Sequence, residues 1–282
     1  WLSTFVDKMK EEAYENNILH PKFSQTNVVT GRLSCSDPNF QNIPRGDKLP
    51  IKRVIQSRFD NGEIIEMDFA QLEFRVAAFL SQDSQAMQDI LEGVDVHQNT
   101  ANVIGCNRQD AKAHTFKPLY GGMSGTDEEK KYYSYFRKRY KGITSWQETT
   151  EDKAIATSFV TLPSGRQYYF EGIKRASWGG SNFYTQVRNY PVQGFATGDI
   201  VPAACIDIYK QMKGMRTRLI NTVHDSIIID AHPGEVDSVL KKLKKACDGI
   251  TQSINQRYNI DFNVPLDYEI KKGHNWLDLK RI

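Results

Sequence analysis

The distribution of apolar residues along the chain predicts β-strands at several places. Residues 63–68 (EIIEMD) form an apolar run that ends in a carboxylate. Residues 219–223 and 226–230 are two further apolar runs on either side of His224–Asp225, an arrangement that predicts an antiparallel hairpin. Residues 161–170 (TLPSGRQYYF) contain a Pro-Ser-Gly turn signal between two short runs, so a second hairpin is predicted there.

Helical periodicity, in which apolar residues recur three or four positions apart, predicts most of the remaining elements. The predicted helices lie at the start of residues 1–20, in 71–82, 128–160 and 193–213, and from Pro233 to Ile254. Another helix is expected to begin near Asn107, because Asp110 follows this capping residue three positions later. Residues 21–56 are rich in Asn, Ser, Pro and Gly, which indicates turns and extended segments.

Antiparallel strands and segregated helices favour an α+β fold over a regular βαβ series. The chain contains neither GxGxxG nor GxxxxGK[ST], which disfavours parallel dinucleotide- or phosphate-binding folds. Its 282 residues are 39% apolar and 25% charged, enough for a packed core. No apolar run is long enough to predict a transmembrane helix. The cysteines form no CxxC pair, so neither a zinc site nor a disulfide framework is expected.

The net charge of +3 permits nucleic-acid binding but does not argue for it. Any such function must therefore be argued from local patterns. The first residue is Trp1 rather than Met, and the charged stretch behind it is no signal peptide. We therefore expect the chain to be a piece of a longer protein, or a processed product.

Two carboxylates stand at the ends of predicted apolar strands. Asp68 ends the first strand, and Asp225 lies in the turn of the predicted hairpin. If brought together, two such carboxylates repel unless a cation neutralises them, and hard oxygen ligands of this kind suit a site with two Mg²⁺ ions. Spacing alone favours the simpler interpretation, in which Asp68 caps the next helix and Asp225 is an ordinary turn residue.

Two cations and two aromatic residues recur at four-residue spacing after Asn107. Arg108, Lys112 and Phe116 share one stripe of a helix, and Tyr120 follows one turn later. Such a face would hold a triphosphate and stack on a base. On spacing alone, a solvated basic face with Phe116 in the core is the commoner case.

Taken together, these residues belong to segments that resemble family A DNA polymerases, the group of bacterial DNA polymerase I and many phage replicases. The similarity runs from about residue 18 to the carboxyl end. It is carried by TGRLSCSDPNFQNIP (30–44), DFAQLEFRVAAFLSQD (68–83), RQDAKAHTFKPLYGG (108–122), NYPVQGFATGDI (189–200), VHDS (223–226) and VPLDYEIKKGHNWLDL (264–279). Their order along the chain makes a chance match improbable.

The resemblance implies a right-hand architecture, with an antiparallel-sheet palm, helical fingers and most of the thumb absent. The implied domains are a thumb remnant with its connection (1–29), the first part of the palm (30–100), the fingers (101–187) and the second part of the palm (188–282). The implied activity is template-directed DNA synthesis, in which dNTPs are added to a primer 3′ end by two-metal phosphoryl transfer with release of pyrophosphate.

The resemblance also assigns site residues. Asp68 and Asp225, with the carbonyl of Phe69, would hold two Mg²⁺ ions, and Lys112 would join the two aspartates in catalysis. The residues implied for the incoming nucleotide are Arg108, Lys112, His97, Phe116, Tyr120, Gln71 and Glu73. Among these, Glu73 would exclude ribonucleotides by closing the space beside the sugar 2′ carbon.

Primer–template DNA is the implied macromolecular partner. Arg32, Asn42, Gln193 and His224 would contact the duplex at its minor-groove edge, where acceptors are similarly placed in all correct pairs. The resemblance further implies a monomer that works inside a bacterium or a phage-infected cell, an organelle also being allowed, with any processivity factor unknown. The compact motifs favour a phage replicase as the source.

Some residues depart from the family pattern. Pro118 lies inside the predicted helix and should end or kink it before Tyr120, and Ser226 follows Asp225 where a Glu is commoner. A single-subunit RNA polymerase would fit Ser226 better, but Glu73 and the 30–44 segment oppose it. A primer–template-binding remnant without catalysis is the other alternative.

Overall fold

The computed structural model describes residues 6–13, 17–44 and 50–282, except for the side chains of Lys8, Lys112 and Ala113. The chain forms two compact units. The first comprises the described parts of Trp1–Ala70, Thr197–Ile254 and Asp267–Ile282, and the second comprises Gln71–Ala196 and Asn255–Leu266. The main antiparallel sheet belongs to the first unit and most helices to the second, so the predicted α+β class is confirmed. The four-part division into thumb remnant, palm and fingers stays a prediction.

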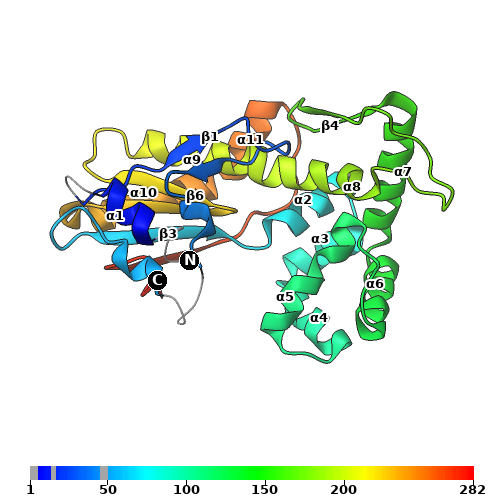
Figure 1. Ribbon diagram of the computed structural model, residues 1–282, viewed down its shortest axis with the longest axis horizontal. Coiled ribbons are helices and arrows are strands. Elements are labelled where there is room, and N and C mark those ends of the chain that lie inside the picture. Colours follow the sequence, from blue (N-terminus) through cyan, green and yellow to red (C-terminus); the bar gives the residue numbers. More distant parts are fainter. Residues whose placement is uncertain (1–5, 14–16, 45–49) are drawn as a thin grey trace. The chain divides into compact units, whose positions relative to one another are not determined.

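A five-stranded antiparallel sheet with strand order β6-β7-β3-β8-β9 forms the centre of the first unit (Figure 1). Its strands are β3 (Glu63–Phe69), β6 (Arg218–Val223), β7 (Ser226–Ala231), β8 (Tyr268–Gly273) and β9 (Lys280–Arg281). The predicted strand at 63–68 and the predicted hairpin around His224–Asp225 are therefore confirmed. All six residues of β7 are buried, as expected of a strand covered on both faces.

Helices α9 (Val201–Gln211) and α10 (Val236–Asp248) pack on one another and lie beside this sheet in Figure 1. The predicted single helix from Pro233 to Ile254 is wrong in detail. Residues Pro233–Glu235 form a 3₁₀ turn (η6), and the helix breaks at Gly249 before α11 (Ile250–Tyr258). Glycine lacks a side chain to restrict its backbone, so it is a weak point in a helix.

The amino-terminal segments are short, as the composition of residues 21–56 predicts. The described elements there are α1 (Lys8–Glu12), β1 (Lys22–Ser24), β2 (Ser34–Ser36), η2 (Phe40–Asn42) and η3 (Ile51–Val54). The rest of the helix predicted within residues 1–20 falls partly on 1–5 and 14–16, outside the described residues. Met9, Cys35, Phe40 and Trp276 form one buried cluster that joins these segments to the sheet.

The second unit is mainly helical. Its elements are α2 (Leu72–Ser81), α3 (Ser84–Leu91), α4 (Val96–Ile104), α5 (Arg108–Thr115), η4 (Lys117–Tyr120), α6 (Asp127–Arg139), α7 (Lys141–Thr157), β4 (Phe159–Thr161), β5 (Gln167–Tyr169) and α8 (Tyr184–Gln193). A π-helical segment, η5 (Gly194–Ile200), connects α8 to α9. Phe195 in this segment is fully buried and stacks on Phe79. The aromatic ring at this position therefore packs in the hydrophobic core.

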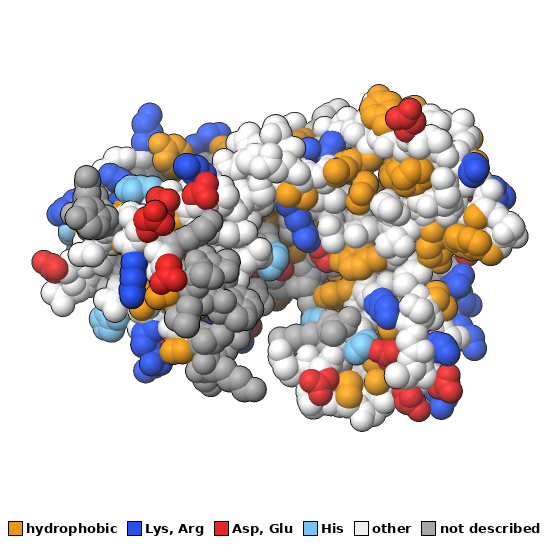
Figure 2. Space-filling model, in the orientation of Figure 1, with side chains coloured by type: hydrophobic (Ala, Val, Ile, Leu, Met, Phe, Trp, Pro, Cys, Tyr) orange, Lys and Arg blue, Asp and Glu red, His pale blue; other side chains and the backbone are white. Residues whose placement is uncertain are grey.

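Helix α6 buries three of its four aromatic residues, the fourth being Tyr135. Tyr132, Tyr133 and Phe136 are buried, whereas Lys131 and Lys138 are exposed. Figure 2 shows blue Lys and Arg side chains gathered over this helix. These buried aromatic rings therefore pack the unit rather than stack on a ligand.

Candidate active site

The two aspartates predicted to bind metal come together in the first unit. Asp68 is the penultimate residue of β3 and is paired with Ser226, the first residue of β7. Asp225 precedes Ser226 in the β6–β7 turn, and its carbonyl oxygen accepts a hydrogen bond of 3.2 Å from the Phe69 N–H. Both aspartates are partly exposed. The sheet register therefore places all three predicted metal ligands at one corner of the hairpin.

The turn depends on two neighbours of Asp225. His224 adopts a left-handed backbone conformation with φ of 57°, which tight turns often require. The hydroxyl of Ser226 is buried and donates to the Val223 carbonyl at 3.0 Å. The residue that stands where a third carboxylate is commoner therefore stabilises the turn itself.

The donor atoms at this corner fit a hard divalent cation, because carboxylate and carbonyl oxygens are the ligands that Mg²⁺ prefers. Within the described ranges, no group of three or more His, Cys, Asp or Glu side chains is arranged to hold a metal ion. The predicted set of metal ligands needs only two carboxylates and a backbone carbonyl.

Three of the four residues predicted to contact DNA line one cavity of about 290 Å³ in the first unit. These are Arg32, Asn42 and His224. Arg32 donates from Nε to the Thr197 hydroxyl at 2.7 Å, which fixes the position of its guanidinium. Gln193, the fourth, ends α8 in the second unit.

Gly198 brings two segments of this cavity wall together. A Cβ at this position would lie 2.6 Å from the Thr30 carbonyl oxygen, closer than a real side chain allows. The absence of a side chain lets the chain around Thr30 approach η5, and thereby places Arg32 beside Thr197. No pattern in the sequence indicated Thr197, although it falls within the 189–200 segment.

The cationic helix of the second unit begins as predicted. The side chain of Asn107 accepts a hydrogen bond of 2.9 Å from the Asp110 N–H, so the predicted cap is confirmed. Arg108 is exposed and donates from Nε to Asp95 at 2.6 Å. The side chain of Lys112 lies outside the described part of the chain, and only its place on α5 is known.

Asp95 serves both as a helix cap and as the partner of Arg108. Its Oδ1 accepts from the N–H groups of His97 and Gln98 at the start of α4. Partial burial opposes its ionisation, but the hydrogen bonds from Arg108 and from the backbone outweigh this effect. The pKa of the Asp95 carboxyl is therefore lower than its ordinary value. Asp95 was not singled out from the sequence, although it begins the DVH triplet that contains His97.

The aromatic part of the predicted nucleotide site is assembled in the second unit. The rings of His97 and Phe116 are 5.1 Å apart in an edge arrangement, and Phe74 stacks on Phe116 at 6.5 Å. The imidazole Nδ1 of His97 also lies 3.0 Å from the Thr115 hydroxyl. Phe116 is only partly buried. The ring therefore has support on one side and remains accessible on another.

Glu73 and Tyr120 are in direct contact, because the Tyr120 hydroxyl donates a hydrogen bond to the Glu73 carboxylate. Helix α5 ends at Thr115, and a 3₁₀ turn with Pro118 near its start carries Tyr120. The prediction that Pro118 ends the helix is thus confirmed. Gln71 has a left-handed backbone with φ of 53° and precedes α2; its expected support of the sugar pocket stays a prediction.

No helix among the described residues is long and apolar enough to cross a bilayer.

Comparison with known proteins gives a consistent result. The family model of DNA polymerase family A matches residues 1–278. The thermostable DNA polymerase I of Thermus aquaticus is 27% identical over 99% of this chain and 35% of its own length. The DNA polymerase I of Pseudomonas aeruginosa is 30% identical over 97% of the chain and 31% of its own length. The chain thus spans about a third of the length of these relatives.

Among solved structures, the fold is similar to the POL domain of Pol1 from M. smegmatis, which was solved in complex with a DNA primer-template and dNTP. The TM-score is 0.81 at 24% identity, over 99% of this chain and 51% of the other. This likeness supports the fold. Because the family match extends over nearly the entire sequence, the chain belongs to DNA polymerase family A.

Proposed function

We propose that this chain catalyses template-directed DNA synthesis, adding dNTPs to the 3′ end of a primer with release of pyrophosphate. The observation that carries the proposal is the register of β3 against β7, which sets Asp68 opposite Ser226 and beside Asp225. Phosphoryl transfer requires positioning and charge neutralisation more than covalent help from the protein. Paired carboxylates at the end of a buried hairpin are suited to that task.

Asp68, Asp225 and the carbonyl of Phe69 would hold two Mg²⁺ ions. When bound, such ions lower the pKa of the attacking hydroxyl and stabilise the leaving oxygen. The role of the chain is to fix the two carboxylates in position before the metal ions and the substrate bind. Residues in paired strands change position little, so the carboxylates need not reorganise during the reaction.

Arg108 and Lys112 would bind the triphosphate of the incoming dNTP, and His97 would join them. A guanidinium forms strong charge-assisted hydrogen bonds to phosphate oxygens. Arg108 now pairs with Asp95, so a triphosphate would compete with that carboxylate or share the guanidinium. Phe116, supported by Phe74, would pack on the base and sugar.

Glu73 would act as the sugar gate, with Gln71 in support, and Tyr120 would stack at the templating position. The hydrogen bond from Tyr120 to Glu73 links the two roles. A 2′-hydroxyl on the sugar would have to displace the carboxylate or disrupt this bond. Sugar selection would therefore depend on where Tyr120 is held.

Arg32, Asn42 and His224 would contact the primer–template duplex from the cavity that they line, and Gln193 would extend the contact. Such contacts sense the shape of a correct pair without reading its sequence. Binding that includes phosphate contacts should weaken steeply as salt rises. We further propose that the chain acts as a monomer inside a bacterial or phage-infected cell, with 30–100 and 188–282 as palm and 101–187 as fingers.

Primer extension with Mg²⁺ tests this function. We expect the parent chain to extend a primer, and Asp68→Ala and Asp225→Ala to lose about a thousandfold or more in rate, since metal ions supply several kcal/mol of transition-state stabilisation. Both variants should retain duplex binding. Glu63→Ala is the matched control, because Glu63 is a carboxylate at the other end of β3 that pairs with Lys272.

Three outcomes would contradict the proposal. Unchanged extension by either aspartate variant would exclude the two-metal assignment. Preferential use of rNTPs over dNTPs by the parent would favour an RNA polymerase. A parent chain that binds primer–template and never extends it would be a binding remnant without catalysis.

A further inference from the structure

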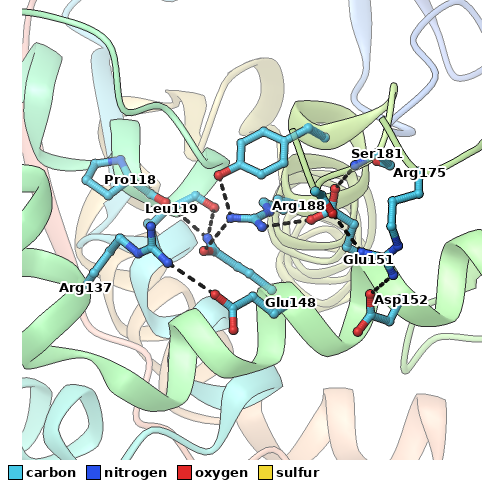
Figure 3. Close-up of polar contacts among 12 residues, drawn as sticks. Pro118, Leu119, Arg137, Glu148, Glu151, Asp152, Arg175, Ser181 and Arg188 are labelled. Carbon is cyan, nitrogen blue, oxygen red and sulfur yellow. Dashed lines mark hydrogen bonds and ion pairs between the residues drawn. The ribbon is translucent and has the colours of Figure 1, made fainter. Parts of the chain in front are cut away.

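A chain of buried polar side chains ends at the turn that carries Tyr120 (Figure 3). Gln147 on α7 donates from Nε2 to the carbonyl oxygens of Pro118 and Leu119, at 3.1 and 2.7 Å. These are the two residues immediately before Tyr120. The amide oxygen of Gln147 in turn accepts from Arg188 on α8 at 3.4 Å.

The break in the fingers helix creates the need for such a donor. Pro118 ends the regular helix, so the carbonyls at the end of the 3₁₀ turn need other donors. The Pro118 carbonyl accepts from the Gly121 N–H at 3.0 Å, whereas the Leu119 carbonyl has Gln147 as its donor. Leu119 is fully buried, and a buried carbonyl without a partner is unfavourable. Gln147 satisfies the Leu119 carbonyl from a neighbouring helix and gives the Pro118 carbonyl a second donor.

Arg188 fixes which way the Gln147 amide faces. An amide has one acceptor end and one donor end, and a flipped Gln147 would turn its oxygen toward two carbonyl oxygens. Arg188 Nη1 occupies the acceptor end, so the donor end must face the turn. Tyr184 holds the guanidinium in place by accepting from Nη1 at 2.9 Å.

Glu151, one helical turn after Gln147 on α7, neutralises Arg188. Their ion pair is 2.8 Å long, and the two side chains are 6% and 5% exposed. The second oxygen of Glu151 accepts from the Ser181 N–H. Arg188 Nε has no hydrogen-bond partner among the described residues, so the guanidinium is incompletely satisfied.

Such a buried ion pair is poor evidence for added stability, since apolar replacements are often as stable. The position of the pair beside Gln147 indicates instead that it helps to keep the turn before Tyr120 in one conformation. Gly121, which follows Tyr120, has φ of 77°, and a Cβ there would lie 2.6 Å from Tyr184 and 2.9 Å from Arg188. The turn is thus held both by hydrogen bonds and by close packing against the same two side chains.

We propose that Gln147, oriented by the buried Arg188–Glu151 pair, is a positioning residue that sets the place of Tyr120 and thereby the selection of deoxyribonucleotides over ribonucleotides. Tyr120 contacts Glu73 directly, so a displaced turn moves the partner of the sugar gate. The inference about sugar selection rests on the proposed function. The inference about the turn itself does not.

Two substitutions of similar size separate hydrogen bonding from packing. Gln147→Met fills the same space without a donor. Gln147→Glu adds a second negative charge beside Arg188 but presents only acceptors to the two carbonyls. If Gln147 served merely to pack around Arg188 or to accept its hydrogen bond, the glutamate variant would behave like the parent. Glu148→Gln is the control, because this neighbouring residue is exposed and pairs with Arg137 on the surface.

Hydrogen exchange of the amides of residues 119–122 is the first measurement, and it needs no catalysis. We expect both Gln147 variants to lose protection about three- to tenfold in this turn, the effect of one to two lost hydrogen bonds, with Glu148→Gln unchanged. Unaltered protection in two folded variants would overturn the proposal. Equal loss across α2 to α8 would also overturn it, because it would indicate a general structural role.

The second measurement is the ratio of kcat/KM for dNTP over rNTP in primer extension. Both Gln147 variants should reduce this ratio about three- to tenfold, while the KM for primer–template is unchanged. A preserved ratio together with an altered turn would overturn the link to sugar selection. If the parent chain extends no primer, the proposed function fails, and hydrogen exchange still decides whether Gln147 holds the turn.

The exposed ion pair between Arg175 and Asp152 provides a matched test of the buried pair (Figure 3). Asp152 follows Glu151 on α7, yet its side chain is 62% exposed. Glu151→Gln should reproduce the effects of the Gln147 variants on the turn, because it weakens the hold on Arg188. Asp152→Asn should change neither measurement, and an equal effect of the two substitutions would contradict the proposed orientation of Gln147.

Discussion

The two regions that carry the candidate site are held by different forces. Asp68 and Asp225 are placed by backbone hydrogen bonds of β3, β6 and β7, whose apolar residues are buried. The cationic and aromatic residues of the second unit lie on short helices whose ends are fixed by side chains. Asp83 is an example: its carboxylate accepts from the N–H groups of Ala86, Gly142 and Ile143, and so ties α3 to the start of α7.

This difference has a chemical consequence. Backbone hydrogen bonds between strands tolerate most side-chain substitutions and hold carboxylates in one place. This suits a metal site whose ligands must not move during the reaction. Side-chain anchors can be exchanged for ligand contacts, as Arg108 would exchange Asp95 for phosphate. The helical region is therefore expected to depend more strongly on individual buried polar residues than the sheet region does, although Asp230 on β7 is itself buried and pairs with Arg58.

We expect the largest effect on stability from a substitution of Asp89. Its side chain is 1% exposed and accepts from Arg139 twice, from Tyr140 and from Gln85. We expect Asp89→Asn to lower the free energy of unfolding by about 3 kcal/mol, because removing one partner leaves a charge without compensation. Urea unfolding measures the loss, and hydrogen exchange should place it in α3, α6 and α7 rather than in β3 and β7.

The pH dependence of this effect has a defined sign. Burial opposes ionisation of Asp89, but hydrogen bonds from Arg139, Tyr140 and Gln85 outweigh it, so its pKa is lowered in the folded state. Its contribution is complete above the unfolded-state pKa of about 3.9 and is lost as pH falls through the lower folded-state value. The difference between parent and variant should therefore shrink below about pH 4. Asp127→Asn, which affects an exposed pair on α6, is the control.

Arg108→Gln is expected to have an intermediate effect. The KM for dNTP should rise about tenfold, with a smaller change in kcat, because the charge-assisted contact that we propose between Arg108 and the triphosphate would be lost. Steady-state primer extension at varied dNTP measures it. Asp95→Asn is the control, since asparagine also caps a helix while Arg108 keeps its charge. An equal rise in KM for Asp95→Asn would mean that Arg108 serves only the fold.

The smallest effect is expected at the edge of the sheet. Arg281 on β9 pairs with Glu269 on β8 at 3.0 Å, and the two side chains are 71% and 38% exposed. Arg281→Gln should change the free energy of unfolding by less than about 0.5 kcal/mol, as is usual for exposed ion pairs. If urea unfolding showed a loss of more than about 1 kcal/mol in the free energy of unfolding, the contrast between the two regions would be wrong. The sheet would then depend on surface charge as well.

Much of the fold was predictable because local patterns and the final packing agree. The strand at 63–68, the His224–Asp225 hairpin and the Asn107 cap each depend on neighbours in sequence. The end of the helix before Tyr120 was also predictable, since Pro118 lacks an N–H and clashes with the preceding turn. The roles proposed for the site residues follow from the family resemblance rather than from spacing.

The parts that could not be predicted involve partners far apart in sequence. Gln147 and Glu151 are visible as an i, i+4 pair on a helix, but nothing local indicates that Arg188 lies between them and the turn before Tyr120. The contact of Arg32 with Thr197 depends in the same way on the close approach at Gly198. Such pairings are set by tertiary packing, which a single sequence does not display.

The strand order of the sheet has a consequence for biosynthesis. The central strand β3 pairs with β7 and β8, which lie far downstream, whereas α2 to α8 follow β3 directly and pack among themselves. On the ribosome the helical unit has almost all of its chain available before either neighbour of β3 has been synthesised. We expect its helices to fold first, with β3 waiting as an unpaired apolar strand, so newly made chains depend on rapid completion or on chaperones to avoid aggregation.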